Sequence, residues 1–456
     1  MTRDATQIPS TKRKVAFMFT GQGSHYTSMA KQLFTDSSTF KSHILQFDKI
    51  AKTQGFPSIL GLIDGSVTDI SGLSPVIVQL GAICVQMALS RLWTSWGVVP
   101  TTVLGHSLGE YAALNAAGVL SVSDTIYLVG TRARLLEEKC HAGSHAMLAV
   151  KGSVASIGQV LDGETFEVAC INGPDETVVS GTNVNIDMLC ADLKDRGFKS
   201  TKLAVPFAFH SAQVEAILDE FEDSAKGVNF EPPSIPVISP LLSEVISDGS
   251  TFGPGYLRRH CRETVNFLGG LEASRHASLV ADKSLWLEIG SHPLCSSMIK
   301  ATMGPHVQTA SSLRRNEDNW KTLAGSLCTL HDAGLSVDWS EYHRGFESSH
   351  KLLRLPTYKW DNKNYWIDYK NNWALTKGDA GLAAEQEAAK PQFAAASVHR
   401  IVEQDLTGDK PSIVTESDLS DPLLKEAIDG HEVNGFGLCP PVSGLTPVLA
   451  ESTNSY

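Results

Sequence analysis

A serine stands at the centre of a Gly-x-Ser-x-Gly motif, GHSLG at residues 105–109, between a short apolar stretch and an alanine-rich one. The pattern predicts a strand at residues 101–104, a sharp turn and then a helix. Such a turn holds its middle residue in a strained backbone conformation, with the side chain exposed where N–H groups of the helix favour negative charge. Ser107 is therefore a candidate nucleophile, and the N–H of Leu108 is part of a candidate oxyanion hole. The alternative is an ordinary serine in a strand-to-helix turn.

Two residues elsewhere in the chain have the chemistry to complete such a site. Gln22 lies between two glycines directly after the apolar stretch 14–20, where its backbone N–H and side-chain amide face the end of a predicted strand. The alternative for Gln22 is a plain loop. Arg132 falls on the apolar side of a predicted helix over residues 121–139. Because an unpaired buried arginine is costly, Arg132 is expected to bind a carboxylate, either of a ligand or in a structural salt bridge.

His210 is a further candidate for this site. It follows the apolar residues 206–209, which include Phe209, and it precedes a predicted helix over residues 213–225. A lone histidine in such a place is often a packed core residue. Its position favours a role in the site, because it comes where the chain returns from a predicted inserted domain, and clefts between domains are common sites.

The elements that must position these residues predict an α/β fold with a parallel sheet, similar to that of α/β-hydrolases. Between residues 144 and 205 the pattern changes to strand, helix, strand, strand, helix, strand. This βαββαβ order is typical of a ferredoxin-like subdomain. We therefore expect a core made of residues 14–143 and 206–330, with a ferredoxin-like subdomain at residues 144–205 inserted into it.

The remaining segments carry weaker patterns. A polar lead-in at residues 1–13 is expected to be disordered, and residues 331–370 form an ordered segment after the core. Residues 371–397 are rich in Ala, Gly and Gln and are typical of a linker. Residues 398–456 are too few for an independent fold of any usual type, and they end in a tail with no core of its own.

Composition excludes several classes of function. The net charge is −12 and no long basic run occurs, so a nucleic-acid partner is not expected. The eight cysteines are scattered without a C-x-x-C pair, which favours reduced thiols in the cytoplasm over disulfides or a metal site. No signal peptide is visible, and no apolar run reaches the roughly 18 residues that a membrane helix needs.

Six motifs then occur in one order, and together they are highly specific. They are GQGSHY at 21–26, GHSLGEYAAL at 105–114, Arg132, NGP at 172–174, FAFH at 207–210 and GSHP at 290–293. This set resembles the malonyl-CoA:acyl carrier protein acyltransferases, and most closely the acyltransferase domain of fungal non-reducing iterative polyketide synthases. The resemblance covers about residues 14–441.

The resemblance implies an acyl transfer through a seryl ester. His210 would take the proton of Ser107, which attacks malonyl-CoA, and the N–H groups of Leu108 and Gln22 would hold the oxyanion. The phosphopantetheine thiol of an acyl carrier protein would then accept the malonyl group, with no bound cofactor. The histidine would be oriented by a main-chain carbonyl, expected in the 290–293 loop. Arg132 would bind the malonyl carboxylate, and Phe209 would crowd the acyl α-carbon against methylmalonyl groups.

The C-terminal part resembles two further pieces of such a synthase. LPTYKWDNKNYW at residues 355–366 is similar to the linker after the acyltransferase. Residues 418–440 are similar to the start of a product-template domain, whose His-x-x-x-Gly-x-x-x-x-Pro motif falls on His431, Gly435 and Pro440. The family pattern stops there, so His431 is expected to be a remnant without catalytic work. The chain is expected to be an acyltransferase cut out of a larger synthase, or a truncated product.

Two other functions stay open at this point. A serine thioesterase or hydrolase would share the turn around Ser107, but it would need an acid to orient a late histidine and would use water as acceptor. A non-catalytic fragment of a polyketide synthase would keep the scaffold without the chemistry.

Overall fold

The computed structural model describes residues 13–70, 72–158, 166–280, 284–358, 398–407, 412–430, 432–433 and 436–437. By internal contacts the chain divides into two compact units, residues 1–350 and 351–456. The first unit includes residues 331–350, the start of the segment expected after the core. Of the second unit, the described elements are β12 (Arg400–Asp405), β13 (Ser412–Glu416), α15 (Pro422–Asp429), β14 (Glu432–Val433) and β15 (Phe436–Gly437).

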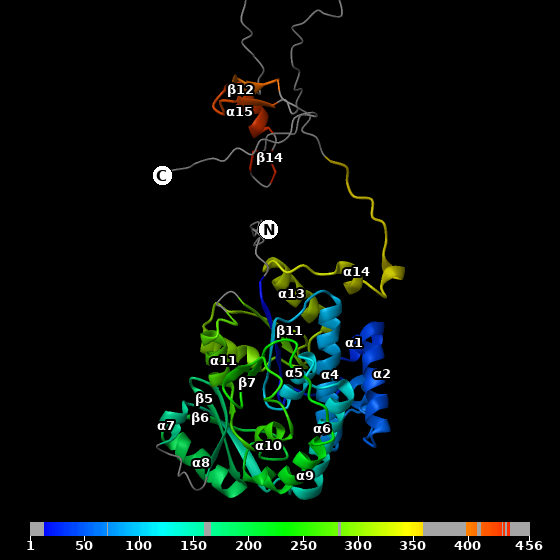
Figure 1. The fold of residues 1–456 in the computed structure, drawn as a ribbon, viewed down its shortest axis with the longest axis vertical. Helices are drawn as coiled ribbons and strands as arrows, with labels where there is room; N and C mark the ends of the chain where they lie inside the picture. Colours follow the sequence, from blue (N-terminus) through cyan, green and yellow to red (C-terminus); the bar gives the residue numbers. More distant parts are fainter. Residues whose placement is uncertain are drawn as a thin grey trace, which may run out of the picture. The chain divides into compact units, whose positions relative to one another are not determined.

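A six-stranded sheet forms the centre of the first unit (Figure 1). Its strand order is β11 (Gln308–Ser311), β10 (Leu285–Ile289), β1 (Val15–Phe19), β2 (Thr102–Gly105), β7 (Val237–Ser239) and β8 (Glu244–Ile246). Five strands are parallel, as predicted, and β8 pairs antiparallel to β7 at one edge. The short connection between β7 and β8 permits only an antiparallel pair, so the sheet is mixed.

Helices cover both faces of this sheet. Val15, Phe17 and Phe19 of β1 join the larger core, whereas the alternating Ala16 and Met18 join a second core. The helices that pack on the first face include α1 (Lys31–Asp36), α2 (Ser38–Thr53), α3 (Leu60–Asp64), α4 (Pro75–Ser95), α5 (Gly109–Ala116), α6 (Val122–Lys139), α9 (Glu215–Ala225) and α13 (Asn319–Asp332). The second face is covered by α11 (Phe267–His276) and α12 (Cys295–Met303). Two short elements, α14 (Trp339–Tyr342) and a 3-10 turn at Glu347–Ser349, follow α13.

Among the described residues, one helix, α4, is long and apolar enough to cross a membrane by length and composition. Its most apolar 18-residue window has a mean hydropathy of 1.5, so the expectation that no stretch reaches this length is wrong here. That window is 89% buried inside the fold, between α2, α5 and α6, which identifies α4 as a core helix. Its start has the usual serine N-cap followed by proline: Ser74 Oγ accepts from the N–H of Val76, and Pro75 is the first helical residue.

The inserted subdomain has the predicted βαββαβ order. Its elements are β3 (His145–Lys151), α7 (Val154–Gly158), β4 (Glu167–Gly173), β5 (Glu176–Thr182), α8 (Asn183–Asp195) and β6 (Lys199–Lys202). The strand order β6-β3-β5-β4 is ferredoxin-like, and a separate small core lies under α8. A fifth strand, β9 (Val265–Asn266), comes from the larger domain and pairs parallel to β4. It directly follows α10 (Pro254–Arg262), so the two domains share one sheet edge.

Candidate active site

Ser107 lies on a sharp turn between β2 and α5. Its φ is +49°, a left-handed conformation that a non-glycine residue adopts only under constraint. The two flanking glycines explain how the turn is built. A Cβ on Gly105 would lie 2.2 Å from Glu110 Cα, and one on Gly109 would lie 2.3 Å from the carbonyl oxygen of Phe19. Only glycine lets the strand, the helix and β1 come this close, so the predicted turn is observed.

His210 lies directly against this serine. Its Nε2 is 2.7 Å from Ser107 Oγ, and its Nδ1 is 3.0 Å from the main-chain carbonyl oxygen of Glu263. A carbonyl can only accept, so Nδ1 carries the proton and Nε2 is free to accept from the serine hydroxyl. The orienting group is thus a main-chain carbonyl, but the expectation that it lies in the 290–293 loop is wrong. The carbonyl comes from the end of α10, just before β9.

The 290–293 loop supports a different part of the site. Ser291 Oγ donates to the carbonyl oxygen of Ser24 at 2.7 Å, and Gly290 lies against Thr20, where a Cβ would be 1.8 Å from Thr20 Oγ1. The loop therefore packs on the segment that follows β1, which carries Gln22. The carboxyl ends of parallel strands share one edge of the sheet, which is why a prediction from position alone favoured this loop.

Gln22 and Leu108 follow neighbouring strands at this edge. Phe19 at the end of β1 pairs with Gly105 at the end of β2, and Gly21 packs directly on His106. Leu108 is buried at the start of α5, whereas Gln22 is half-buried. In the described part of the chain, neither the N–H of Gln22 nor that of Leu108 donates a hydrogen bond. Both donors are therefore available to a ligand.

Arg132 is fully buried on α6, as its place on the apolar side of that helix predicts. One nitrogen, Nη1, donates to Gln79 Oε1 at 2.9 Å, and the guanidinium lies over the ring of Phe209, 5.4 Å from its centroid. Nε and Nη2 have no hydrogen-bond partner among the described residues, and no ion pair to Arg132 occurs there. A structural salt bridge, one of the two expectations for this residue, is therefore not found in the described chain. A buried cation with two free donors fits an anionic ligand.

The electrostatic surroundings keep His210 uncharged. Burial lowers its pKa well below the ordinary value of 6.5, and the charges of His260 and Arg132 act in the same direction. The bond to the Glu263 carbonyl opposes this shift only weakly. A neutral imidazole with a free Nε2 is the form that accepts a proton from a hydroxyl.

Sequence reasoning missed several residues that surround the pair. His106 Nε2 contacts Asn172 Oδ1 at 2.8 Å, which joins the serine turn to the inserted subdomain; the NGP motif was the available signal. Glu110 is buried, accepts from the hydroxyl of Tyr256, and lies 3.4 Å from His260 Nε2. The orienting carbonyl of Glu263 has no sequence signal, because any residue type supplies the same group.

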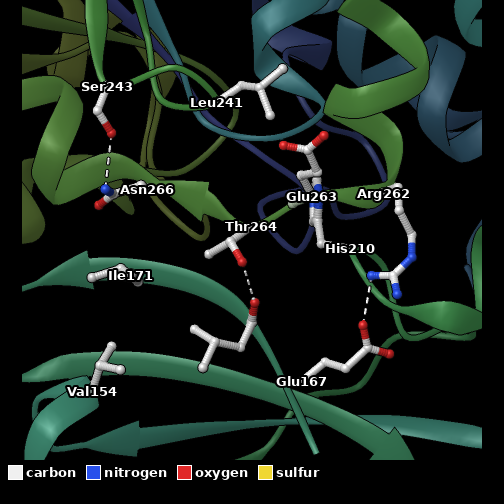
Figure 2. Close-up of a pocket in the computed structure, with 11 residues that line it drawn as sticks. Val154, Glu167, Ile171, His210, Leu241, Ser243, Arg262, Glu263, Thr264 and Asn266 are labelled. Carbon is white, nitrogen blue, oxygen red and sulfur yellow. Dashed lines mark hydrogen bonds and ion pairs between the residues drawn. The ribbon is translucent and has the colours of Figure 1, made fainter.

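A cavity of about 560 Å³ opens beside His210, between the two domains. Figure 2 shows it bounded by β4 and α7 of the insert on one side and by the segment of Glu263 on the other. Its lining is both apolar and polar, and comprises Val154, Glu167, Val168, Ile171, His210, Leu241, Ser243, Arg262, Glu263, Thr264 and Asn266. The cavity gives a ligand access to the base from outside.

Two other expectations concern metal sites and the C-terminal motif. Among the described residues no cluster of His, Cys, Asp and Glu side chains has the arrangement to hold a metal ion. His431, Gly435 and Pro440 lie outside the described residues, as do residues 1–12, the whole of the 371–397 linker and residues 438–456.

Comparison with known proteins gives a consistent result. The chain is 56% identical over 453 residues to the non-reducing polyketide synthase PvBS090_009107 of Byssochlamys spectabilis, which covers 99% of this chain and 21% of that protein. The chain thus spans about a fifth of the length of this relative. An acyltransferase domain from the second module of the salinomycin polyketide synthase is 28% identical, with a TM-score of 0.67 over 76% of this chain and 80% of that one. The malonyl CoA-acyl carrier protein transacylase of Clostridium perfringens shares the fold at 22% identity, with a TM-score of 0.62 over 70% of this chain and 98% of that one.

The family model that matches describes the acyl transferase domain, and the match extends over residues 16–337. This range contains the central sheet, the inserted subdomain, the pair of Ser107 and His210, and Arg132. The chain therefore belongs to the acyl transferase domain family.

Proposed function

We propose that this chain transfers a malonyl group from malonyl-CoA, through an ester on Ser107, to the phosphopantetheine thiol of an acyl carrier protein in polyketide biosynthesis. The observation that carries the proposal is a serine–histidine pair at 2.7 Å beside a fully buried arginine with two free donors. The pair supplies an activated nucleophile, and the arginine supplies a site for an acid. A seryl acyl transfer of a dicarboxylic acyl group needs both.

The first half-reaction starts with the neutral imidazole. His210 Nε2 takes the proton of Ser107 Oγ as the oxygen attacks the thioester carbonyl, and the carbonyl oxygen becomes negatively charged. The C–S bond then breaks, and the CoA thiolate leaves with the proton from His210. The second half-reaction runs in the opposite direction, with the carrier thiol as nucleophile and Ser107 as leaving group.

The oxyanion would be held by the N–H groups of Leu108 and Gln22. Both are free of other hydrogen bonds in the described chain, and Leu108 lies at the start of a helix, where the dipole favours negative charge. Loss of one such donor typically costs on the order of 10²-fold in rate.

Arg132 would select the acyl group. Its two free nitrogens match a carboxylate with two parallel hydrogen bonds, whereas an acetyl group leaves them unpaired in a buried place. Phe209, buried under the guanidinium, would crowd the acyl α-carbon. A single added methyl group is worth only about 1–3 kcal/mol, so this second selection against methylmalonyl is weaker.

The partner and the location belong to the same proposal. The cavity beside His210 lies between apolar and polar walls, which suits the amide-containing arm of CoA or of a carrier protein. All seven cysteines in the described residues carry free thiols, which is consistent with a cytoplasmic location.

The hydrolase alternative is not favoured by the geometry. It needs a carboxylate on His210, and Nδ1 instead faces the main-chain carbonyl of Glu263. The reading as a non-catalytic fragment is not favoured either, because the catalytic pair is within hydrogen-bond distance.

The test is intact-mass detection of a malonyl adduct after mixing with malonyl-CoA, with Ser107→Ala as the control. Retained adduct on Ser107→Ala would contradict the nucleophile. For Arg132→Ala we expect malonyl loading to fall by about 10²-fold or more relative to acetyl loading, and unchanged selectivity would remove the carboxylate role. A carrier protein is then added: malonyl-carrier supports the transferase, and free malonate alone supports a hydrolase.

A further inference from the structure

The segment that bears His210 and the segment that bears its orienting carbonyl are far apart in sequence and meet at one side chain. Glu167, the first residue of β4 in the inserted subdomain, accepts from the N–H of Ala212 through Oε1 at 2.7 Å. Its other oxygen, Oε2, is 2.6 Å from Arg262 Nη1. Ala212 is two residues after His210, and Arg262 directly precedes Glu263. The carboxylate of Glu167 therefore contacts both the segment of His210, which donates the Nδ1 hydrogen bond, and the segment of Glu263, which accepts it.

We propose that Glu167 is a positioning residue, which sets the distance between His210 and the Glu263 carbonyl and so holds the imidazole against Ser107. This inference rests on the proposed acyl transfer, because it concerns the base of that reaction. Figure 2 shows Glu167 and Arg262 joined across the cavity next to His210 and Glu263.

The base needs such support because its backbone is strained. His210 has a φ of +59°, a left-handed conformation for a non-glycine residue, and no glycine flanks it. Local bonds hold part of this turn, since Ser211 Oγ donates to the carbonyl oxygen of Ala208 at 2.6 Å and the N–H of Ala208 donates to Gln213 Oε1 at 2.7 Å. Two contacts from distant segments add to them. The Glu263 carbonyl supplies one contact, and the bond from the Ala212 N–H to Glu167 supplies another.

The other contacts of this segment support the same role. Arg262 also donates from Nε to Glu215 Oε1 at 2.8 Å, at the start of α9, the helix that follows His210. Thr264 Oγ1 donates to the carbonyl oxygen of Val168, directly after Glu167. The two segments are thus tied to β4 on both sides of the base.

The ion pair is partly solvated, with side-chain exposures of 29% for Arg262 and 37% for Glu167, so its contribution to stability is small. Its effect is instead geometric, because a small misplacement of a catalytic group has a large cost in rate. We therefore expect variants of Glu167 to change the rate constant of the serine and to leave unfolding almost unchanged.

The experiment measures the reaction of Ser107 with a fluorophosphonate probe in the full chain. In this reaction an O–P bond forms, the P–F bond breaks, fluoride leaves and the serine proton passes to His210. The probe carries no CoA and no carboxylate. A failure of the malonyl proposal therefore leaves this test valid, because wild type would still react with the probe.

Three variants are compared with wild type. Glu167→Ala loses both contacts, and we expect a labelling rate about tenfold lower. Glu167→Gln keeps an oxygen for the Ala212 N–H and loses the charge facing Arg262, so we expect a loss of about threefold. Asp187→Ala removes a comparable ion pair with Lys202 on the same subdomain, away from the base, and is expected to stay within about twofold.

The steady-state constants separate positioning from substrate binding. For Glu167→Ala we expect kcat with malonyl-CoA to fall by the same factor as labelling, with KM within about twofold of wild type. A wild-type labelling rate in Glu167→Ala would overturn the proposal. So would a raised KM with an unchanged labelling rate, which would make the pair a binding site for CoA. If Glu167→Ala does not fold, equal labelling of wild type and Glu167→Gln overturns it.

Discussion

Ser107 and His210 adopt similar strained backbones but are held there by different means. Their φ angles are +49° and +59°, both left-handed. The turn at Ser107 is fixed by backbone packing in the central sheet, where two glycines let β2 and α5 pass each other and let α5 approach β1. The turn at His210 has local bonds, such as that from Ser211 Oγ to the carbonyl oxygen of Ala208, and it also has two contacts distant in sequence, the Glu263 carbonyl and the Glu167 carboxylate.

The position of Ser107 is set mainly by the backbone of the central sheet, whereas the position of His210 depends also on the inserted subdomain. Ser107, the proposed nucleophile, belongs to the central sheet, and the bond between His106 and Asn172 joins its turn to the insert. The base lies where the insert and the core share a sheet edge, because β9 pairs with β4 immediately after Glu263. Substitutions around Ser107 should therefore lower the free energy of unfolding, and substitutions around His210 should lower the rate constant of acylation.

The largest effect is expected when either member of the pair is removed. Ser107→Ala and His210→Ala should each lower the rate of covalent malonylation by at least about 10³-fold, because the two act as one unit. For the same reason the double variant should be no slower than the slower single variant. Single-turnover acylation followed by intact mass measures this. Additive losses in the double variant would show that the two regions act independently.

The next effect concerns the serine turn. In Gly109→Ala the new Cβ would lie 2.3 Å from Phe19 O and 2.6 Å from Thr20 O, and neither backbone can yield without parting β1 from α5. We expect a loss of about 2–4 kcal/mol in the free energy of unfolding, measured by denaturant titration, together with loss of acylation.

Gly325→Ala is the matched control for this change. It lies in α13 with no atom within 4 Å of the new Cβ, so the helix should gain about 0.5–1 kcal/mol instead. Equal stabilities of the two variants would mean that close packing at the turn does not fix the serine.

The same contrast explains what the sequence could predict. The serine turn and the βαββαβ order of the insert depend on patterns of neighbouring residues, and the structure has both. The burial of Arg132 followed from the helical period of α6. These signals come from residues close together in the sequence and do not depend on contacts between distant segments.

The features that the sequence did not predict depend on contacts between distant segments. The orienting carbonyl was expected in the 290–293 loop because that loop ends a strand at the correct edge. Every residue has a main-chain carbonyl, so no residue type in the sequence points to Glu263 as its source. The two-residue strand β9 is too short for a periodic pattern. The sequence also gives no signal for Glu167, because a carboxylate at the start of a strand does not reveal its two partners.

A smaller effect is expected where the Glu263 segment is tied to the insert. Thr264→Val keeps the shape of the side chain and removes the hydroxyl that donates to Val168 O at 2.7 Å. We expect kcat to fall by about two- to fivefold with KM unchanged, because the acceptor of Nδ1 loses one anchor. Thr94→Val loses a similar hydroxyl-to-carbonyl bond in α4 and should not alter kcat. A KM effect for Thr264→Val alone would place this threonine in substrate binding.

The smallest effect is expected from pH, and it concerns the base region alone, since the serine hydroxyl does not titrate in this range. Burial, and then the nearby His260 and Arg132, lower the pKa of His210 well below 6.5. A lowered pKa means that the neutral, proton-accepting form persists as the pH falls. The acylation rate constant should therefore stay flat from neutral pH to 6.5, where an ordinary histidine would have lost half of its base form. Circular dichroism over the same range controls for unfolding. A midpoint at or above 6.5 in the acylation profile would mean that His210 is solvated in the working enzyme, and hence that the contacts from Glu263 and Glu167 do not hold it in the cleft.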